Sequence, residues 1–262
     1  MTLTFLGTGT SGGVPSLGCH CPVCISTNPH DKRLRCAALL ETDTTRILID
    51  CGPDIRQQLM PLPFKPLNGV LLTHIHYDHV AGLDDLRPYC KFGDINVYAN
   101  DKTVKGLQRT MPYCFAEHLY PGVPKLALHE ICAHKPFRIG DIDILPIQVM
   151  HDKMPILGFR FGNFAYITDM KSISPSETIY LHGIDTLVVN ALRWAKPHHS
   201  HILVHEAIDF AHSIGAHRTY LTHLTHKIGF HDRANSCLPP DVRFAYDGLQ
   251  INIGGNGDCS TP

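Results

Sequence analysis

The 262-residue sequence has almost no net charge and lacks any long apolar run. Its 23 lysines and arginines nearly balance 24 aspartates and glutamates, so no overall field attracts nucleic acid or an anionic membrane. No apolar stretch reaches the roughly 18 residues that a membrane span needs. No basic segment precedes Leu3 and Phe5, because the first Lys or Arg is Lys32. These absences predict a cytoplasmic protein with neither a membrane nor nucleic acid as its partner.

The ten cysteines lack the regular spacing of a disulfide framework, which favours thiols, some of them bound to metal. Histidine is the unusually common residue, with 19 copies against 23 lysines and arginines. Histidine is the commonest metal ligand in proteins, although most histidines lie on surfaces or in hydrogen-bonded cores. Metal chemistry is therefore the first hypothesis, and the positions of the residues must test it.

The hydrophobic pattern alternates strands with helices. Runs rich in β-branched residues predict strands at 3–6, 46–49, 69–72, 95–98, 142–149, 164–167, 186–189 and 219–221. Helical spacing predicts helices at 53–60, 80–86, 101–110 and 202–214. No linker, repeat or charge block divides the chain. We expect one α/β domain over residues 1–254 and a disordered tail over 255–262.

Several predicted strands end at a residue that can bind metal, and catalytic groups in layered α/β folds gather at strand ends. These residues are Asp50, His74, His151, Asp169 and His223. The densest segment continues from His74 through His76, Asp78 and His79. Two ions about 3.5–4 Å apart would need a shared anionic ligand and further imidazoles. The alternative is a surface histidine run beside unrelated acidic residues.

The HxHxDH string at 74–79, with Asp50 upstream and His151, Asp169 and His223 downstream, resembles the metallo-β-lactamase superfamily. That resemblance covers residues 1–254 and implies a four-layer αββα sandwich with the site at the sheet edges. It assigns one metal to His74, His76 and His151, the other to Asp78, His79 and His223, and a bridging role to Asp169. Asp50 would support the ligand loop by hydrogen bonding. The alternative is that Asp50 is an ordinary aspartate in a turn at the end of a strand.

A second metal site is predicted in the Gly/Pro-rich segment 19–24, where Cys19, Cys21 and Cys24 lie within six residues. A closed tetrahedral zinc site needs a fourth ligand. The opening GTGTSGGVP at 7–15 and the CxCxxC segment resemble the PhnP-type phosphodiesterase branch. That resemblance implies His226, three residues after His223, as the fourth ligand of a structural zinc. The alternatives are His20 as fourth ligand, or three free thiols.

A main site of nitrogen and oxygen ligands suits manganese, zinc or iron, and two such ions activate water for hydrolysis. Two ions also neutralise the charge of a phosphodiester. His201 resembles the histidine of this branch that binds no metal, and we assign it general acid catalysis or phosphate contact. Its neighbours His198 and His199 leave the register open, and an exposed histidine cluster is the alternative.

Only 17 residues separate His151 from Asp169, which leaves no room for the tRNA-grasping arm of tRNA 3′-endonucleases. The resemblance therefore implies a small phosphodiester substrate, such as a cyclic phosphate of a ribose or nucleotide. The alternatives are a tRNA 3′-processing nuclease, a thioesterase or lactam hydrolase, and a PqqB-like biosynthetic partner that is not a phosphodiesterase. Members of this superfamily are often homodimers, so a homodimer is possible here, but no feature of the sequence marks an interface.

Overall fold

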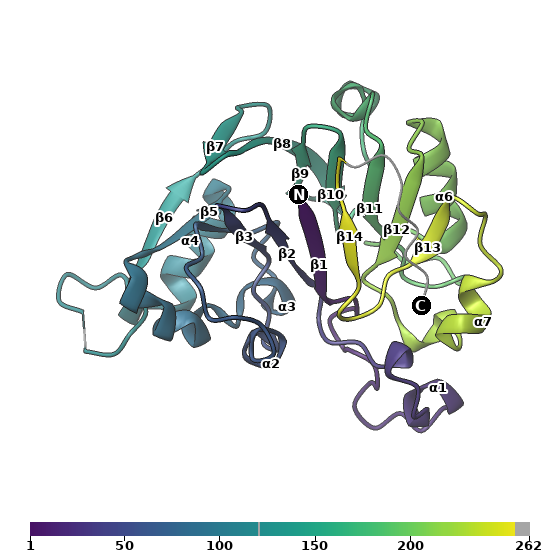
Figure 1. Cartoon of the computed structure of the whole chain (residues 1–262), viewed down its shortest axis with the longest axis horizontal. Helices are drawn as coiled ribbons and strands as arrows, with labels where there is room; N and C mark the ends of the chain where they lie inside the picture. The colour runs from purple at the N-terminus through teal and green to yellow at the C-terminus, as the bar shows by residue number, and fades with distance from the viewer. Residues whose placement is uncertain (120, 255–262) are drawn as a thin grey trace.

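The computed structural model describes residues 1–119 and 121–254, so the predicted tail at 255–262 lies outside the described residues. Two seven-stranded sheets form the body of this part of the chain (Figure 1). The first contains, in order across the sheet, β14 (Gln250–Asn252), β1 (Thr2–Gly7), β2 (Ala37–Glu41), β3 (Arg46–Ile49), β4 (Gly69–Leu71), β5 (Ile95–Ala99) and β6 (Leu126–Glu130). The second contains β13 (Val242–Phe244), β12 (Arg218–Thr222), β11 (Thr186–Asn190), β10 (Phe164–Ile167), β9 (Met154–Phe161), β8 (Ile142–His151) and β7 (Phe137–Ile139).

Helices cover the outer face of each sheet, and many are short. The α-helices are α1 (Pro22–Ile25), α2 (Ile55–Leu59), α3 (Tyr77–Val80), α4 (Asp101–Thr110), α5 (Pro175–Thr178), α6 (Val204–Ser213) and α7 (His231–Asn235). The 3₁₀ helices are Pro29–Asp31, Leu83–Phe92, Pro112–Cys114, Ile179–Leu181 and His226–Ile228. Among the described residues, no helix is both long and apolar enough to cross a bilayer.

Three hydrophobic clusters hold the layers together. The central cluster joins side chains from both sheets, among them Phe5, Phe159 and Tyr166, each fully buried. A second cluster packs α6 against the second sheet, and a third packs α2 and α4 against the first. The burial of apolar surface in three successive layers defines an αββα sandwich. The predicted fold class is therefore confirmed.

Each sheet contains a run of parallel strands that directs its carboxyl ends toward one edge. In the first sheet β3, β4, β5 and β6 are parallel, and in the second β10, β11, β12 and β13 are parallel. β8 and β9 form an antiparallel hairpin, and β8 ends at His151. Parallel strands need crossover helices, which explains the alternation of strands and helices along the chain.

All eight predicted strands are present, but the predicted helix at 80–86 is wrong. The α-helix α3 ends at Val80, and a 3₁₀ helix follows at Leu83–Phe92. Gly82 separates the two and packs so tightly on the carbonyl oxygen of Gly52 that a Cβ would collide with it. Pro88 also lies inside the 3₁₀ helix, where it has no N–H to donate. Six strands were not predicted, and these are β2, β6, β7, β9, β13 and β14.

Substituting a side chain between the two sheets should destabilise the whole fold. Phe159→Ala removes a fully buried ring from the central cluster, so we expect the free energy of unfolding to fall by about 3–5 kcal/mol. Guanidinium denaturation measures this change. Phe92→Ala is the control, because Phe92 is 41% exposed, and its cost should stay below about 1 kcal/mol. Equal losses in both variants would contradict the assigned core.

Candidate dinuclear metal centre

The metal-capable residues converge from the ends of strands in both sheets. Asp50 follows β3, His151 ends β8, and His223 follows β12. Asp50, Asp169 and His223 have φ angles of 60°, 61° and 57°, in the left-handed region that non-glycine residues seldom adopt. Such conformations persist where the surrounding structure imposes them, and they are frequent at functional sites. All three are fully or almost fully buried, so the local backbone turns each polar side chain into the seam between the sheets.

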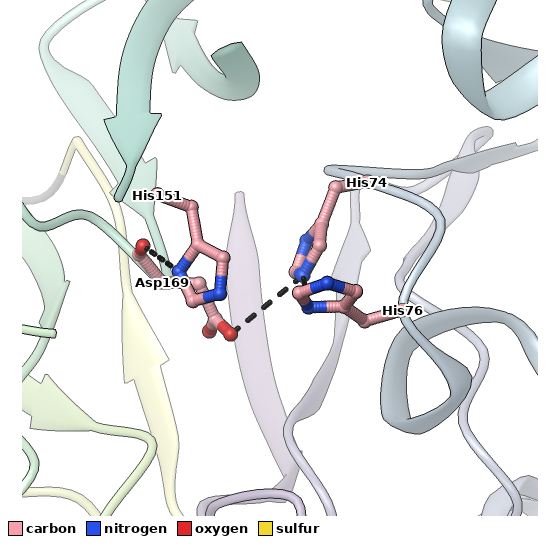
Figure 2. Close-up of side chains that lie close together, drawn as sticks. All are labelled: His74, His76, His151 and Asp169. Carbon is pink, nitrogen blue, oxygen red and sulfur yellow. Dashed lines mark hydrogen bonds and ion pairs between the residues drawn. The ribbon is translucent and has the colours of Figure 1, made fainter. Parts of the chain in front are cut away.

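The first group of possible ligands contains His74, His76, His151 and Asp169, and Figure 2 shows them facing one another from opposite sides of the seam. His74 Nε2 lies 2.9 Å from His76 Nδ1 and 3.7 Å from Asp169 Oδ2. His151 Nδ1 donates to the carbonyl oxygen of Asp169 at 2.7 Å, which leaves Nε2 with a free lone pair. This is the tautomer that a metal-binding imidazole needs.

The second group contains Asp78, His79, Asp169 and His223, so Asp169 belongs to both. His79 Nε2 lies 3.3 Å from both Asp78 Oδ2 and Asp169 Oδ2, and His223 Nε2 lies 3.2 Å from Asp169 Oδ1. Despite these approaches, His79 Nε2 and both ring nitrogens of His223 are buried without a hydrogen-bond partner. Unsatisfied buried nitrogens that face carboxylates fit a bound cation, and these residues therefore fit a metal centre.

Asp50 holds one of these imidazoles in place. His79 Nδ1 donates to Asp50 Oδ2 at 2.7 Å, which directs Nε2 of the same ring toward Asp78 and Asp169. The backbone N–H of Thr73 donates to Asp50 Oδ1, and the Thr73 hydroxyl also contacts this carboxylate. A carboxylate that orients a ligand histidine is the usual outer support of a metal site. This geometry fits the predicted supporting role better than a plain turn.

The imidazoles and carboxylates of the site shift one another's pKa values in different directions. Burial lowers the pKa of His74 well below its ordinary value, so this ring is neutral. Burial alone would raise the pKa of Asp169, but contacts with His223 and His79 outweigh it and hold the pKa well below its usual range. For His79, burial lowers the pKa, yet Asp169 and Asp50 together raise it well above the ordinary value. The carboxylates thus favour positive charge in this pocket.

His201 lies against the metal centre, whereas His199 lies on the rim. His201 is buried, its Nε2 lies 3.3 Å from Asp169 Oδ2, and its ring stacks on His223. Burial lowers its pKa to about 4, although the contact with Asp169 opposes the shift. His199 is exposed and lines the cavity outside the centre. His198 contacts Nδ1 of His201, the ring nitrogen that does not face Asp169, so the geometry favours His201 among the three candidate histidines.

The sequence reasoning missed a layer of hydroxyl groups beneath the site. Thr73, Thr168 and Thr222 each directly precede a predicted ligand and are fully buried. The Thr168 hydroxyl donates to Asp169 Oδ1, and the Thr222 hydroxyl lies 3.4 Å from Cys36 Sγ. The Cys36 thiol also contacts the hydroxyl of Tyr166, and its burial raises its pKa to about 11. The repeated Thr–ligand pair was a signal that could have revealed this layer.

The predicted zinc loop also assembles a cluster. One possible ligand atom each from Cys19, Cys21 and His226 lies within 4.8 Å of the others. Cys24 lies beside them in a small buried cluster with Val14, where burial raises its thiol pKa to about 11. His20 is exposed and does not belong to this group. The arrangement fits three thiolates and one imidazole, the donor set of a structural zinc site.

One short segment connects the two sites. His223 and His226 belong to the same turn, and Leu224 between them is bonded to the opening loop. Thr10 N donates to the carbonyl oxygen of Leu224, and Leu224 N donates to the carbonyl oxygen of Thr8. The opening loop at 7–15, which precedes the zinc loop, therefore supports the segment that presents His223.

A further cluster of His30, His231 and Asp232 lies where the 3₁₀ helix Pro29–Asp31 meets α7. The Arg33 guanidinium donates to His231 Nδ1 at 3.0 Å, so the proton of this neutral ring lies on Nε2. Neither ring nitrogen then offers a lone pair to a cation. We interpret this cluster as a structural joint.

The fold and the paired His/Asp groups define a metallo-hydrolase class of site, and comparisons with known proteins agree. The family model described as the β-lactamase superfamily domain matches residues 45–224. A solved structure described as a new diphosphatase from the PhnP family is 36% identical, with a TM-score of 0.88, and the match covers 95% of this chain and 96% of that one. The chain belongs to the β-lactamase superfamily and, within it, to the PhnP family.

Other relatives carry different names. A protein of Porphyromonas gingivalis (strain ATCC BAA-308 / W83) named octanoyltransferase is 43% identical over 98% of this chain, but this chain covers only 52% of it. A coenzyme PQQ synthesis protein B of Methylobacterium radiotolerans is 36% identical over 36% of this chain and 37% of its own length. The chain thus spans about half or less of these curated relatives.

The zinc loop can be tested by metal content. Cys21→Ser should remove about one zinc ion per chain and lower the melting temperature, because zinc binding contributes to folding. Inductively coupled plasma mass spectrometry and thermal denaturation measure the two effects. Cys132→Ser is the control, since Cys132 is exposed and lies outside the described clusters. Unchanged zinc content in Cys21→Ser would refute the site.

Proposed function

We propose that the chain is a dinuclear metal-dependent phosphodiesterase that acts on small phosphodiesters, such as cyclic phosphates of ribose or nucleotides. The observation that carries this proposal is the position of Asp169, which two groups of buried imidazoles and carboxylates share. A shared anionic ligand is what two adjacent divalent ions need. The similarity to a PhnP-family diphosphatase supports a phosphorus ester as the substrate.

The proposed ligands divide into two sets around Asp169. One ion would be held by His74, His76 and His151, and the other by Asp78, His79 and His223. Manganese, zinc or iron suits this nitrogen and oxygen donor set, and the zinc loop would hold a structural zinc. When bound, the two ions would supply Lewis-acid activation of water and neutralise charge on the phosphodiester.

The remaining chemistry belongs to the chain. His201 Nε2 faces the ionised carboxylate of Asp169, so this nitrogen carries the proton, and Nδ1 accepts from the Ser200 hydroxyl at 3.0 Å. We assign His201 the donation of a proton or hydrogen bond to the oxygen of the leaving alcohol. Asp50 and Thr73 keep His79 and His74 oriented, so the ligand loop needs little reorganisation when substrate binds.

A small substrate is supported by the course of the chain after His151. Residues 152–168 are occupied by the tight turn at Asp152–Lys153 and by β9 and β10, which pair with each other. No segment is left for a substrate-grasping arm at this point. None of the described cysteines forms a disulfide, which suits the reducing cytoplasm to which this proposal assigns the protein.

A second candidate is hydrolysis of an acyl thioester. The observation that favours it is the 43% identity to a protein named octanoyltransferase, although this chain matches only about half of that protein. A metal-activated water can attack a thioester carbonyl as well as phosphorus. Octanoyl thioesters therefore belong in the same assay as the phosphodiesters, and turnover of the thioester alone would favour this candidate.

Loss of Asp78 should abolish phosphodiester hydrolysis. With manganese-loaded protein and bis(p-nitrophenyl) phosphate, Asp78→Ala should lower kcat/KM by about 100-fold or more, because even outer supports of metal sites contribute 10–100-fold. Release of nitrophenolate measures the rate, and circular dichroism checks the fold. Asp143→Ala is the control, since Asp143 pairs only with Arg138 on an exposed hairpin. Undiminished turnover in Asp78→Ala would exclude the dinuclear assignment.

The role of His201 can be tested with leaving groups of different basicity. His201→Ala should slow hydrolysis of a nucleoside 2′,3′-cyclic phosphate by about 100-fold, because its alkoxide leaving group needs a proton. Bis(p-nitrophenyl) phosphate should lose less than about tenfold, since nitrophenolate leaves without one. Rates for both substrates are compared in the same variant. Equal losses would show that His201 binds phosphate and does not donate a proton.

A further inference from the structure

The zinc loop, residues 19–24, projects from the body of the fold. Figure 1 shows α1 and the chain beside it beyond the ends of both sheets. Next to the loop, Leu17 is fully exposed and Ile25 is 64% exposed. Cys19 and Cys21 are half-buried, whereas Cys24 is buried. Two of the three thiols of the loop therefore lie within reach of a small solute, and the third is shielded.

Cys21 and Cys24 lie at the two ends of one helical turn. Cys21 directly precedes α1, Cys24 lies within it, and the N–H of Ile25 donates to the carbonyl oxygen of Cys21 at 3.1 Å. Cys21 also packs against the small buried cluster that contains Cys24. Residues three apart on a helical turn hold their Cβ atoms about 5–6 Å apart, so a small adjustment reaches the distance of about 3.5–4.5 Å that a disulfide requires. The Cys-x-x-Cys spacing is that of dithiols that undergo oxidation and reduction.

The zinc loop is connected to the catalytic side of the molecule through His226. This residue begins the 3₁₀ helix His226–Ile228, and its Nδ1 lies 3.3 Å from the hydroxyl oxygen of Ser16. The carbonyl oxygen of Ile228 accepts a hydrogen bond of 2.8 Å from Trp194 Nε1. Trp194 is the single tryptophan of the sequence and lies in the segment between β11 and α6, which also contains His201. The fluorescence of Trp194 therefore reports on the order of the His226–Ile228 helix.

We propose that Cys21 and Cys24 form a redox modification site, at which a hydroperoxide converts the pair of thiolates into a disulfide. This inference goes beyond the proposed hydrolysis and does not depend on its substrate. Cys21 reacts first because it is the more exposed of the two, and Cys24 resolves the product because it lies one helical turn away. Cys19, two positions from Cys21, would close a much smaller ring and stays outside the reaction.

The reaction balances with the hydroperoxide as oxidant. The Cys21 sulfur attacks a peroxide oxygen, the O–O bond breaks, and Cys21 becomes a sulfenic acid while hydroxide leaves. The Cys24 sulfur then attacks the sulfur of Cys21, which forms the S–S bond and expels a second hydroxide. Solvent protonates both hydroxides. The pair of thiolates thus loses two electrons, and hydrogen peroxide is reduced to water.

Oxidation would remove half of the donors of the proposed structural zinc. A disulfide leaves only Cys19 and His226 as donors, which are too few for a closed tetrahedral site. Zinc would be lost, and His226 would no longer be tied to the loop. Reduction of the disulfide regenerates both thiolates, so the change is reversible. The metal content of the loop should therefore follow its redox state.

Peroxide treatment of the zinc-loaded protein tests the modification. We expect the loop to lose about one zinc ion and about two thiols per chain, and a reductant followed by zinc to restore both. A colorimetric chelator measures the released zinc. Differential alkylation with tandem mass spectrometry should identify Cys21 and Cys24 as oxidised and Cys19 as reduced. Retention of zinc after the exposed Cys132 is fully oxidised, or a bond between Cys19 and Cys21, would overturn the proposal.

The emission of Trp194 tests the connection through His226. Oxidation should shift this emission to longer wavelength, because a loosened contact with Ile228 admits water to the indole ring. Reduction followed by zinc should reverse the shift, and removal of zinc by a chelator without oxidation should reproduce it. Unchanged emission from protein that has lost its zinc would overturn this connection.

Variants separate the two chemical steps. In Cys24→Ser the reaction should stop at a sulfenic acid on Cys21, which dimedone traps, and a disulfide to Cys19 in this variant would contradict the role of Cys24. Cys132→Ser is the matched control and should release zinc as the wild type does, because Cys132 is exposed and lies outside the loop.

These measurements also separate the modification from the other assignments. If the untreated protein holds no zinc in the loop, the zinc assignment fails, and mass spectrometry of the oxidised wild type still decides whether Cys21 and Cys24 are joined. None of the measurements uses hydrolysis, so failure of the proposed phosphodiesterase activity would leave their outcome unchanged.

Discussion

The structure depends on one constraint, which is that several carboxylates and imidazoles are buried together in the seam between two sheets. Asp50, Asp169 and His79 are buried almost completely, and burial of a single unpaired ion is costly. Part of this cost is offset by mutual contacts, such as that of His79 with Asp50. His79 Nε2 and His223 Nε2 have no hydrogen-bond partner and both lie near Asp78 and Asp169, an arrangement that fits a bound cation.

The same constraint explains the backbone around the site. A strand that simply continued would bury its polar terminal residue in the core or expose it to water. The left-handed turns at Asp50, Asp169 and His223 instead direct each side chain sideways into the seam. The opening loop at 7–15 stabilises the last of these turns, because the backbone of Thr8 and Thr10 is hydrogen-bonded to Leu224 beside His223. A loop far from the reacting groups in sequence thus contributes to their position.

Much of the site could be predicted because its signals are local. A dense string of ligands and polar residues at the ends of apolar strands are visible in the sequence alone. The prediction failed where tertiary contacts decide the outcome. Gly82 packs on the backbone of Gly52, which lies thirty positions earlier in the sequence, and this contact interrupts the predicted helix. The edge strands β6 and β13 also escaped detection, since short partly exposed strands have little hydrophobic periodicity.

The net charge of the chain says little about the charge beside the candidate site. A sum of −1 describes the whole chain, yet two cavities beside the candidate metal centre are lined by four cations from α4 and the turn after His151, which are Lys102, Lys105, Arg109 and Lys153. Screening limits the interaction between exposed charges to about 8–10 Å in physiological salt, so an anion in one of these cavities interacts with the nearby cations and much less with distant acidic residues. The balance of charges excludes a general attraction to polyanions. It does not exclude local binding of a small anion, which agrees with the small phosphodiester proposed as the substrate.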